Sequence, residues 1–185
     1  QILLLSSLHE IYAKDTSDKS VVFRLSDCFK ESLAFIKNEH RAVRIMFVNS
    51  LVGAVDILLL FFLQAKLPEK GIPEWGLGIA LLFMEMGGIA GSKLILKVPK
   101  ASYKCIFAVS SLLVLAGFFA EHSAYYVIMA LGGFTAAVGD DALQVRTNAL
   151  LQDMFPSEQR ATLISMESFL FSVIMIVLSP LAGFV

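Results

Sequence analysis

Residues 44–64 read RIMFVNSLVGAVDILLLFFLQ, an apolar stretch interrupted by a single acidic residue, Asp56. A helix rises about 1.5 Å per residue, so roughly 20 residues cross a hydrocarbon core about 30 Å thick. Four more apolar stretches of similar length follow at 76–96, 104–120, 124–144 and 161–185. The sequence therefore predicts an all-α membrane protein, a polytopic bundle with five full transmembrane spans.

The basic residues fall almost entirely in alternate gaps between these stretches. Of the 15 Lys and Arg residues, all except Lys66 and Lys70 lie before the first stretch, between the second and third, or between the fourth and fifth, including their margins. Lys and Arg are enriched in cytoplasmic loops of membrane proteins. We therefore expect residues 9–43, 97–103 and 145–160 to be cytoplasmic and the protein to lie in the cell membrane.

The composition supports the same class of protein. Apolar residues make up 57% of the chain, against roughly 45–50% in soluble domains, and the mean hydropathy is +0.74. The basic residues form no stripe with interleaved aromatic residues, so nucleic acid is not an expected partner. The lipid bilayer is the expected one.

The polar N-terminal part divides into two segments. Residues 1–8 are predicted to be the tail of an earlier helix, and residues 9–43 a cytoplasmic linker. Within the linker, apolar residues recur at helical spacing, which predicts an amphipathic helix on the membrane surface or against the bundle: Leu25, Phe29, Leu33 and Ile36. We expect the chain to be the middle or C-terminal part of a longer transporter.

Four acidic residues inside predicted spans stand out as candidates: Asp56, Glu85, Asp140 and Asp141. Each charged side chain there costs about 2.5–3.5 kcal/mol or more to insert, so each needs a functional or structural reason. Asp56 is about 18 Å along its helix from Arg44, near the membrane centre. These four acids are the first candidates for a functional site.

Polar residues share helix faces with these acids. The stripes predicted from the spacing are Asn49, Gly53 and Asp56; Glu85, Gly88 and Ser92; Asp140, Gln144 and Thr147; and Asp141 with Asn148. Such stripes should face a water-filled cavity or another helix, since lipid satisfies neither polar nor charged groups. Asp140 and Asp141 differ by about 100° around their helix, so one of them is expected to face the cavity centre. Gly87 and Gly91 form a small-xxx-small pair for close helix packing.

Two roles are open for the acids. One carboxyl group could take up and release a proton as a cavity opens to alternate sides, because burial favours its protonated form near neutral pH. Alternatively, the acids make structural hydrogen bonds or ion pairs between helices. Glu167, near the cytoplasmic end of the last span, is expected to be interfacial.

Enzyme chemistry finds little support. The three histidines, His9, His40 and His122, are isolated and lack metal-ligand spacing, and no phosphate loop, serine nucleophile elbow or HExxH motif is present. We therefore expect no enzyme activity, no metal and no cofactor. A membrane-embedded enzyme, or a channel or scaffold subunit that does not transport, is the alternative of a different class.

Three motifs resemble the major facilitator superfamily of transporters. Residues 156–162, Pro-Ser-Glu-Gln-Arg-Ala-Thr, resemble its loop between helices ten and eleven, with Pro156 and Arg160 in the motif. Residues 179–183, Ser-Pro-Leu-Ala-Gly, look like the Pro-x-x-Gly of its helix eleven. Residues 88–100 are similar to its cytoplasmic Gly-rich, basic motif between helices eight and nine, although the Asp and second Gly of that motif are missing.

The resemblance implies a C-terminal half, with the tail of helix six at residues 1–8 and helices seven to eleven within 44–185. It places Asp56, Asp140 and Asp141 on the cavity-lining helices seven and ten and implies alternating access around a substrate near the membrane centre. The motif style resembles bacterial efflux members, so we expect proton-coupled export, by antiport, of small amphipathic compounds or drugs. Sugar, lipid or metabolite transport remains the alternative. The N-terminal half would be a necessary partner.

Overall fold

The computed structural model describes residues 30, 34, 37–155 and 160–183. These residues form helices and turns without any strand: α3 (His40–Glu69), α4 (Glu74–Leu96), α5 (Tyr103–Glu121), α6 (Tyr126–Met154) and α7 (Arg160–Ala182). All five helices are long and apolar enough to cross a membrane. The prediction of a multi-pass helical membrane protein is confirmed at this level.

Several predictions fall wholly or largely outside the described residues. They are the helical tail at 1–8, the amphipathic helix within 9–43 and the loop residue Pro156. Within the described part, α3 begins at His40, inside the predicted linker, so the helix starts before its apolar span does. α6 continues past the predicted span 124–144 to Met154.

The turn between α3 and α4 is short. Pro68 lies in the last turn of α3. The chain then reverses at Gly71, whose φ of 83° lies in the left-handed region that glycine adopts readily.

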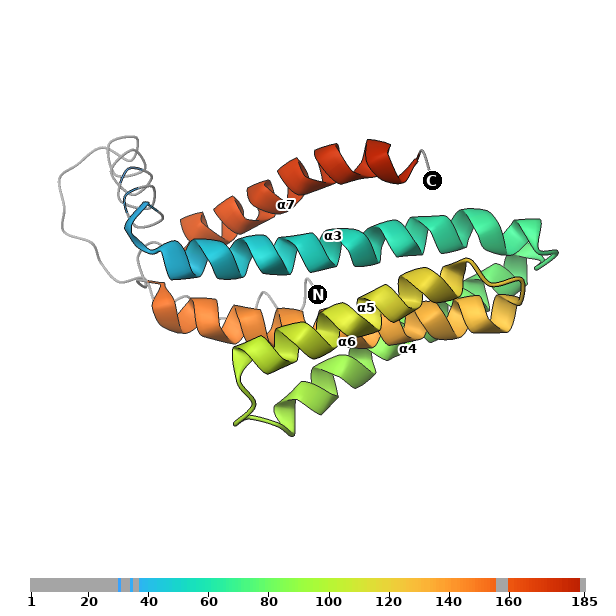
Figure 1. Cartoon of the computed structure of the whole chain (residues 1–185), viewed down its shortest axis with the longest axis horizontal. Coiled ribbons are helices and arrows are strands. Elements are labelled where there is room, and N and C mark those ends of the chain that lie inside the picture. The colour runs from blue at the N-terminus through green and yellow to red at the C-terminus, as the bar shows by residue number, and fades with distance from the viewer. Residues whose placement is uncertain (1–29, 31–33, 35–36, 156–159, 184–185) are drawn as a thin grey trace, which may run out of the picture.

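α6 is the centre of the bundle and packs closely against α4 and α5 (Figure 1). Glycines make this possible: a Cβ atom at Gly87 would meet the backbone oxygen of Phe134, and one at Gly91 would meet that of Val138. On the α5 side, a Cβ at Gly139 would lie 2.8 Å from the backbone oxygen of Ser110. Glycine at these positions lets the helix backbones touch.

α3 and α7 form the other side of the molecule. α3 packs against α6, and α7 packs mainly against α3 (Figure 1). Only Leu163 and Ile174 are buried in α7, which is described over its whole length. α7 is therefore the helix with the least packing in the described bundle.

Large aromatic residues mark the outer end of the bundle. Trp75 opens α4 and Tyr125 precedes α6, with 73% and 70% of their surfaces exposed. Tryptophan and tyrosine are enriched where a membrane protein meets the headgroups. Their position suits the headgroup region at the end of the bundle where α4 and α6 begin.

Candidate functional site

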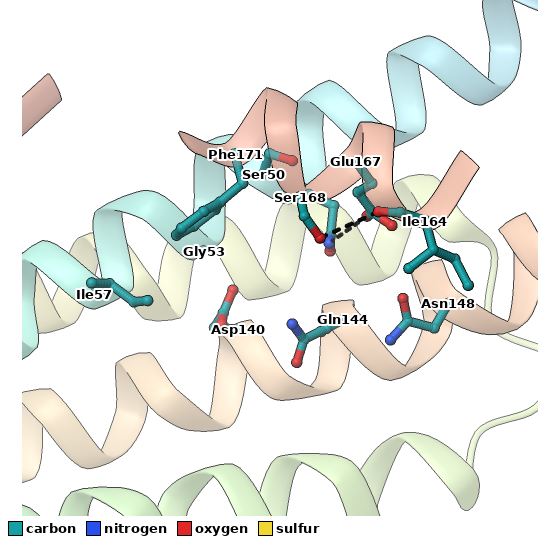
Figure 2. Close-up of a pocket in the computed structure, with 11 residues that line it drawn as sticks. Ser50, Gly53, Ile57, Asp140, Gln144, Asn148, Ile164, Glu167, Ser168 and Phe171 are labelled. Atoms are coloured by element: carbon teal, nitrogen blue, oxygen red, sulfur yellow. Dashed lines mark hydrogen bonds between the residues drawn. The ribbon is translucent and has the colours of Figure 1, made fainter. Parts of the chain in front are cut away.

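A polar cavity of about 410 Å³ opens between α3, α6 and α7 (Figure 2). It lies where α6 and α7 face each other and α3 forms the wall between them. Its lining contains acids, amides, hydroxyls and a few apolar side chains: Asn49, Ser50, Gly53, Ile57, Asp140, Gln144, Asn148, Ile164, Glu167, Ser168 and Phe171. A polar lining of this kind is what the predicted stripes require.

α3 contributes two buried polar residues and one glycine. Asn49 and Ser50 are only 8% and 3% exposed. The Asn49 side-chain amide donates a hydrogen bond to Glu167 Oε1 at 3.3 Å, which links α3 to α7. Gly53 leaves space beside Asp140, since a Cβ built there would lie 3.5 Å from Asp140 Oδ1. Of the predicted α3 stripe, Asn49 and Gly53 line the cavity, whereas Asp56 does not.

α6 presents Asp140, Gln144 and Asn148 to the cavity, one helical turn apart. Figure 2 shows all three side chains on the side of α6 that faces α3 and α7. Asn148 shares the face of Asp141 by spacing, but it lines the cavity whereas Asp141 does not. Thr147, predicted to continue the Asp140 stripe, is instead fully buried and lies 3.1 Å from the Tyr103 hydroxyl on α5.

Asp141 points to a different neighbour. Its carboxylate contacts the backbone of α4 at Gly88, where a Cβ atom would clash with it. It is not among the residues that line the cavity. The two adjacent acids therefore have different environments, as their offset of about 100° around the helix requires.

Asp56 lies beside the cavity. Its Oδ1 is buried and has no hydrogen-bond partner among the described residues. The charged groups that act on Asp56 in this part of the chain are Asp140, Asp141 and Glu85, all of them acids. No Lys, Arg or His of the described residues is among the groups acting on Asp56.

The remaining two acids differ from expectation in their surroundings. Glu85 is exposed on α4, while Gly88 of its predicted stripe is buried against Asp141. Glu167 was expected to be interfacial, but it is half-buried, bonded to Asn49 and part of the cavity. A signal for Glu167 exists in the sequence, because Ile164, Glu167, Ser168 and Phe171 recur on one helix face.

Two arginines hold the cytoplasmic side together. Arg146 donates through Nη2 to the backbone oxygens of Pro99 and Ala101, at 2.8 and 3.1 Å, in the loop between α4 and α5. Arg160 of the predicted loop motif donates to the backbone oxygen of Gln152 at 2.9 Å and so joins the start of α7 to the end of α6. Neither arginine compensates the membrane acids.

Comparison with known proteins identifies no relative. No family model matches this chain, and neither a curated protein nor a solved structure matches it significantly. The function is therefore argued from the site itself.

The arrangement has a clear chemical consequence. Acids in a membrane interior without compensating cations are costly as anions, so protons or a cationic ligand must neutralise them for much of the time. Among the described residues, no three or more His, Cys, Asp or Glu side chains gather where they could hold a metal ion. The site is suited to exchanging protons or organic cations with water in the cavity.

Proposed function

We propose that this chain is part of a secondary active transporter of the major facilitator type. In this proposal, α3 to α7 correspond to helices seven to eleven, and the cavity between α3, α6 and α7 is part of the substrate pathway. The transported compounds are small and amphipathic, and their export across the cell membrane is coupled to proton uptake.

One observation carries the proposal: an acid, Asp140, lines a polar cavity and lies near further acids with no compensating cation in the described bundle. A permanently sealed bundle gains nothing from such groups, because a buried unpaired charge is destabilising. A transporter gains a site that binds a proton in one state and releases it in another. Asp140 has the direct contact with the cavity, and Asp56 lies behind it as a second proton acceptor.

The packing of the helices supports a moving part. α6 is held to α4 and α5 by backbone contacts at glycines, whereas α7 has few buried residues and meets the cavity with polar side chains. Alternating access in transporters of this type arises when groups of helices rock around a central site. We assign α7 to the part that moves relative to α6.

Cysteine accessibility tests this proposal. Asn148 is exposed and lines the cavity, so Asn148→Cys in the full-length protein, with Cys28 and Cys105 replaced by serine, should react with a membrane-impermeant maleimide. Reaction should occur from the cytoplasmic side in one state and should become slower when a pH gradient is imposed, because the cavity then opens toward the other side. Glu74→Cys, at the exposed outer start of α4, should react from outside under both conditions.

Two outcomes contradict the proposal. Simultaneous, unchanged reaction of Asn148→Cys from both sides indicates a channel. Protection from both sides under every condition indicates a closed structural bundle.

A further inference from the structure

We propose that a pocket between the first residues of α3 and α5 binds an anionic phospholipid of the bilayer. The phosphate lies at the basic rim of the pocket, and an acyl chain lies against its apolar wall. The pocket has a volume of about 500 Å³ and shares no lining residue with the cavity between α3, α6 and α7. It is therefore a separate site, and lipid binding there requires a membrane but not transport.

The two helices bring positive charge to one place. α3 and α5 begin at the same end of the bundle (Figure 1), the end predicted to be cytoplasmic. Arg41 and Arg44 enter the pocket from the start of α3, and Lys104 enters it from the start of α5. The N-terminus of a helix also carries a partial positive charge. Three basic side chains and two helix N-termini thus make this rim attractive to an anion.

The positive charge at the rim is not compensated within the described part of the chain. Arg41, Arg44 and Lys104 are exposed, and no Asp or Glu lines the pocket. No ion pair joins any of the three to another described residue. Glu39, the acid nearest to Arg41 in the sequence, is exposed and lies outside the lining. Arginine and lysine both bind phosphate groups well, so a phosphate suits the rim.

The pocket becomes apolar with distance from its rim. Ile45 and Val48 continue the face of α3 that carries Arg41, and Phe107 follows Lys104 by about one turn of α5. Val48 lies about 10 Å beyond Arg41 along the helix, in the direction of the membrane interior. The lining therefore changes from cationic to apolar over the depth at which a phospholipid changes from phosphate to acyl chain.

An anionic phospholipid matches this lining better than a free anion does. A phosphate ion would use the rim and leave the apolar wall unfilled. The ring of Tyr103 adds to that wall, because its hydroxyl group lies 3.1 Å from the Thr147 hydroxyl and already has a partner. Basic pockets between membrane helices on the cytoplasmic side are suited to anionic lipid headgroups. The bilayer itself supplies such lipids directly beside the pocket.

Lipid binding to the purified full-length protein in detergent tests the inference, with bound lipids counted by native mass spectrometry. Dioleoylphosphatidylglycerol is the anionic probe, and dioleoylphosphatidylcholine has the same chains without a net charge. Glycerol phosphate has the anionic group without chains. Phosphatidylglycerol should bind at least tenfold more tightly than phosphatidylcholine, and glycerol phosphate should not compete with it at a hundredfold excess.

Variants of exposed basic residues locate the site without disturbing the packed helices. Lys104→Gln should weaken phosphatidylglycerol binding about fivefold, the effect of one cation beside an anionic headgroup. Arg44→Gln combined with Lys104→Gln should weaken it more than tenfold. Lys97→Gln is the matched control, because Lys97 is exposed at the end of α4 on the same side of the bundle and lies outside the lining. Its affinity should change less than twofold.

Three outcomes overturn the inference. Equal losses in Lys104→Gln and Lys97→Gln indicate general attraction of anionic lipids to a basic surface. Full competition by glycerol phosphate indicates an anion site that does not use the apolar wall. Selective binding that appears only after Leu25, Phe29 and Leu33 are replaced by serine indicates that residues 9–43 of the chain occupy the pocket instead of lipid.

Discussion

The two sides of α6 make different kinds of contacts with the neighbouring helices. Toward α4 and α5, glycines bring helix backbones into direct contact. Toward α3 and α7, the same helix presents Asp140, Gln144 and Asn148 to a cavity. The first side is close-packed and cannot shift without clashes, whereas the second has room and unpaired polar atoms. The contrast indicates that α4, α5 and α6 form a rigid support, and the proposed function uses the opposite side of α6.

The largest expected effect follows from filling the close-packed side. Gly91→Leu places a side chain where even a Cβ atom would clash with the backbone oxygen of Val138, and overpacking costs at least about 1–3 kcal/mol. We expect little folded protein and a clearly lower thermal midpoint in detergent. Gly78→Leu in the same helix is the control, since a Cβ atom there meets nothing within 4 Å. Equal stability of the two variants would contradict the rigid support.

A large side chain placed in the cavity should strongly reduce transport without lowering the thermal stability of the protein. A Cβ at Gly53 makes ordinary contacts with Asp140 and Phe171, at 3.5 and 3.9 Å, so Gly53→Ala should be tolerated. Gly53→Leu extends further into the cavity and should reduce transport at least tenfold, with thermal stability near that of the native protein. Proton flux in proteoliposomes and a melting curve measure the two effects. Full transport by Gly53→Leu would show that the cavity is not the pathway.

The smallest expected effect is at the loop between α4 and α5. Arg146→Gln removes two hydrogen bonds to the loop between α4 and α5, one of them exposed and the other part-buried, so water can replace much of what is lost. We expect faster amide hydrogen exchange at residues 98–106 and little change around the cavity. Arg146→Lys should restore part of the protection. Faster exchange in α7 of Arg146→Gln would instead show that the two sides of α6 are coupled.

The number, approximate length and order of the apolar helices could be predicted from the sequence. Each is a long and mainly apolar run, so its length and composition identify it, and the close approach at Gly87 and Gly91 follows from their spacing. The separation of Asp140 from Asp141 was also predictable, because adjacent residues differ by about 100° around a helix.

The residues that line the cavity could be predicted only in part. Glu167 was placed by its depth along α7, and depth does not determine which side of a helix faces a neighbour. Asn148 was placed by ideal spacing, whereas the cavity spans a wider arc of α6 than one stripe. The unpaired Asn49 Oδ1 and Ser50 Oγ could not be predicted at all, because partners depend on tertiary packing.

The most direct test compares the two adjacent acids of α6. Asp140→Asn and Asp141→Asn make the same chemical change, one at the cavity and one against Gly88. Substrate-dependent proton uptake into proteoliposomes, followed with a pH-sensitive dye, measures coupling in each variant. We predict that Asp140→Asn lowers it more than tenfold, while Asp141→Asn stays within about threefold of the native rate. Unchanged uptake in Asp140→Asn, or a greater loss in Asp141→Asn, would contradict the assignment of function to the cavity side.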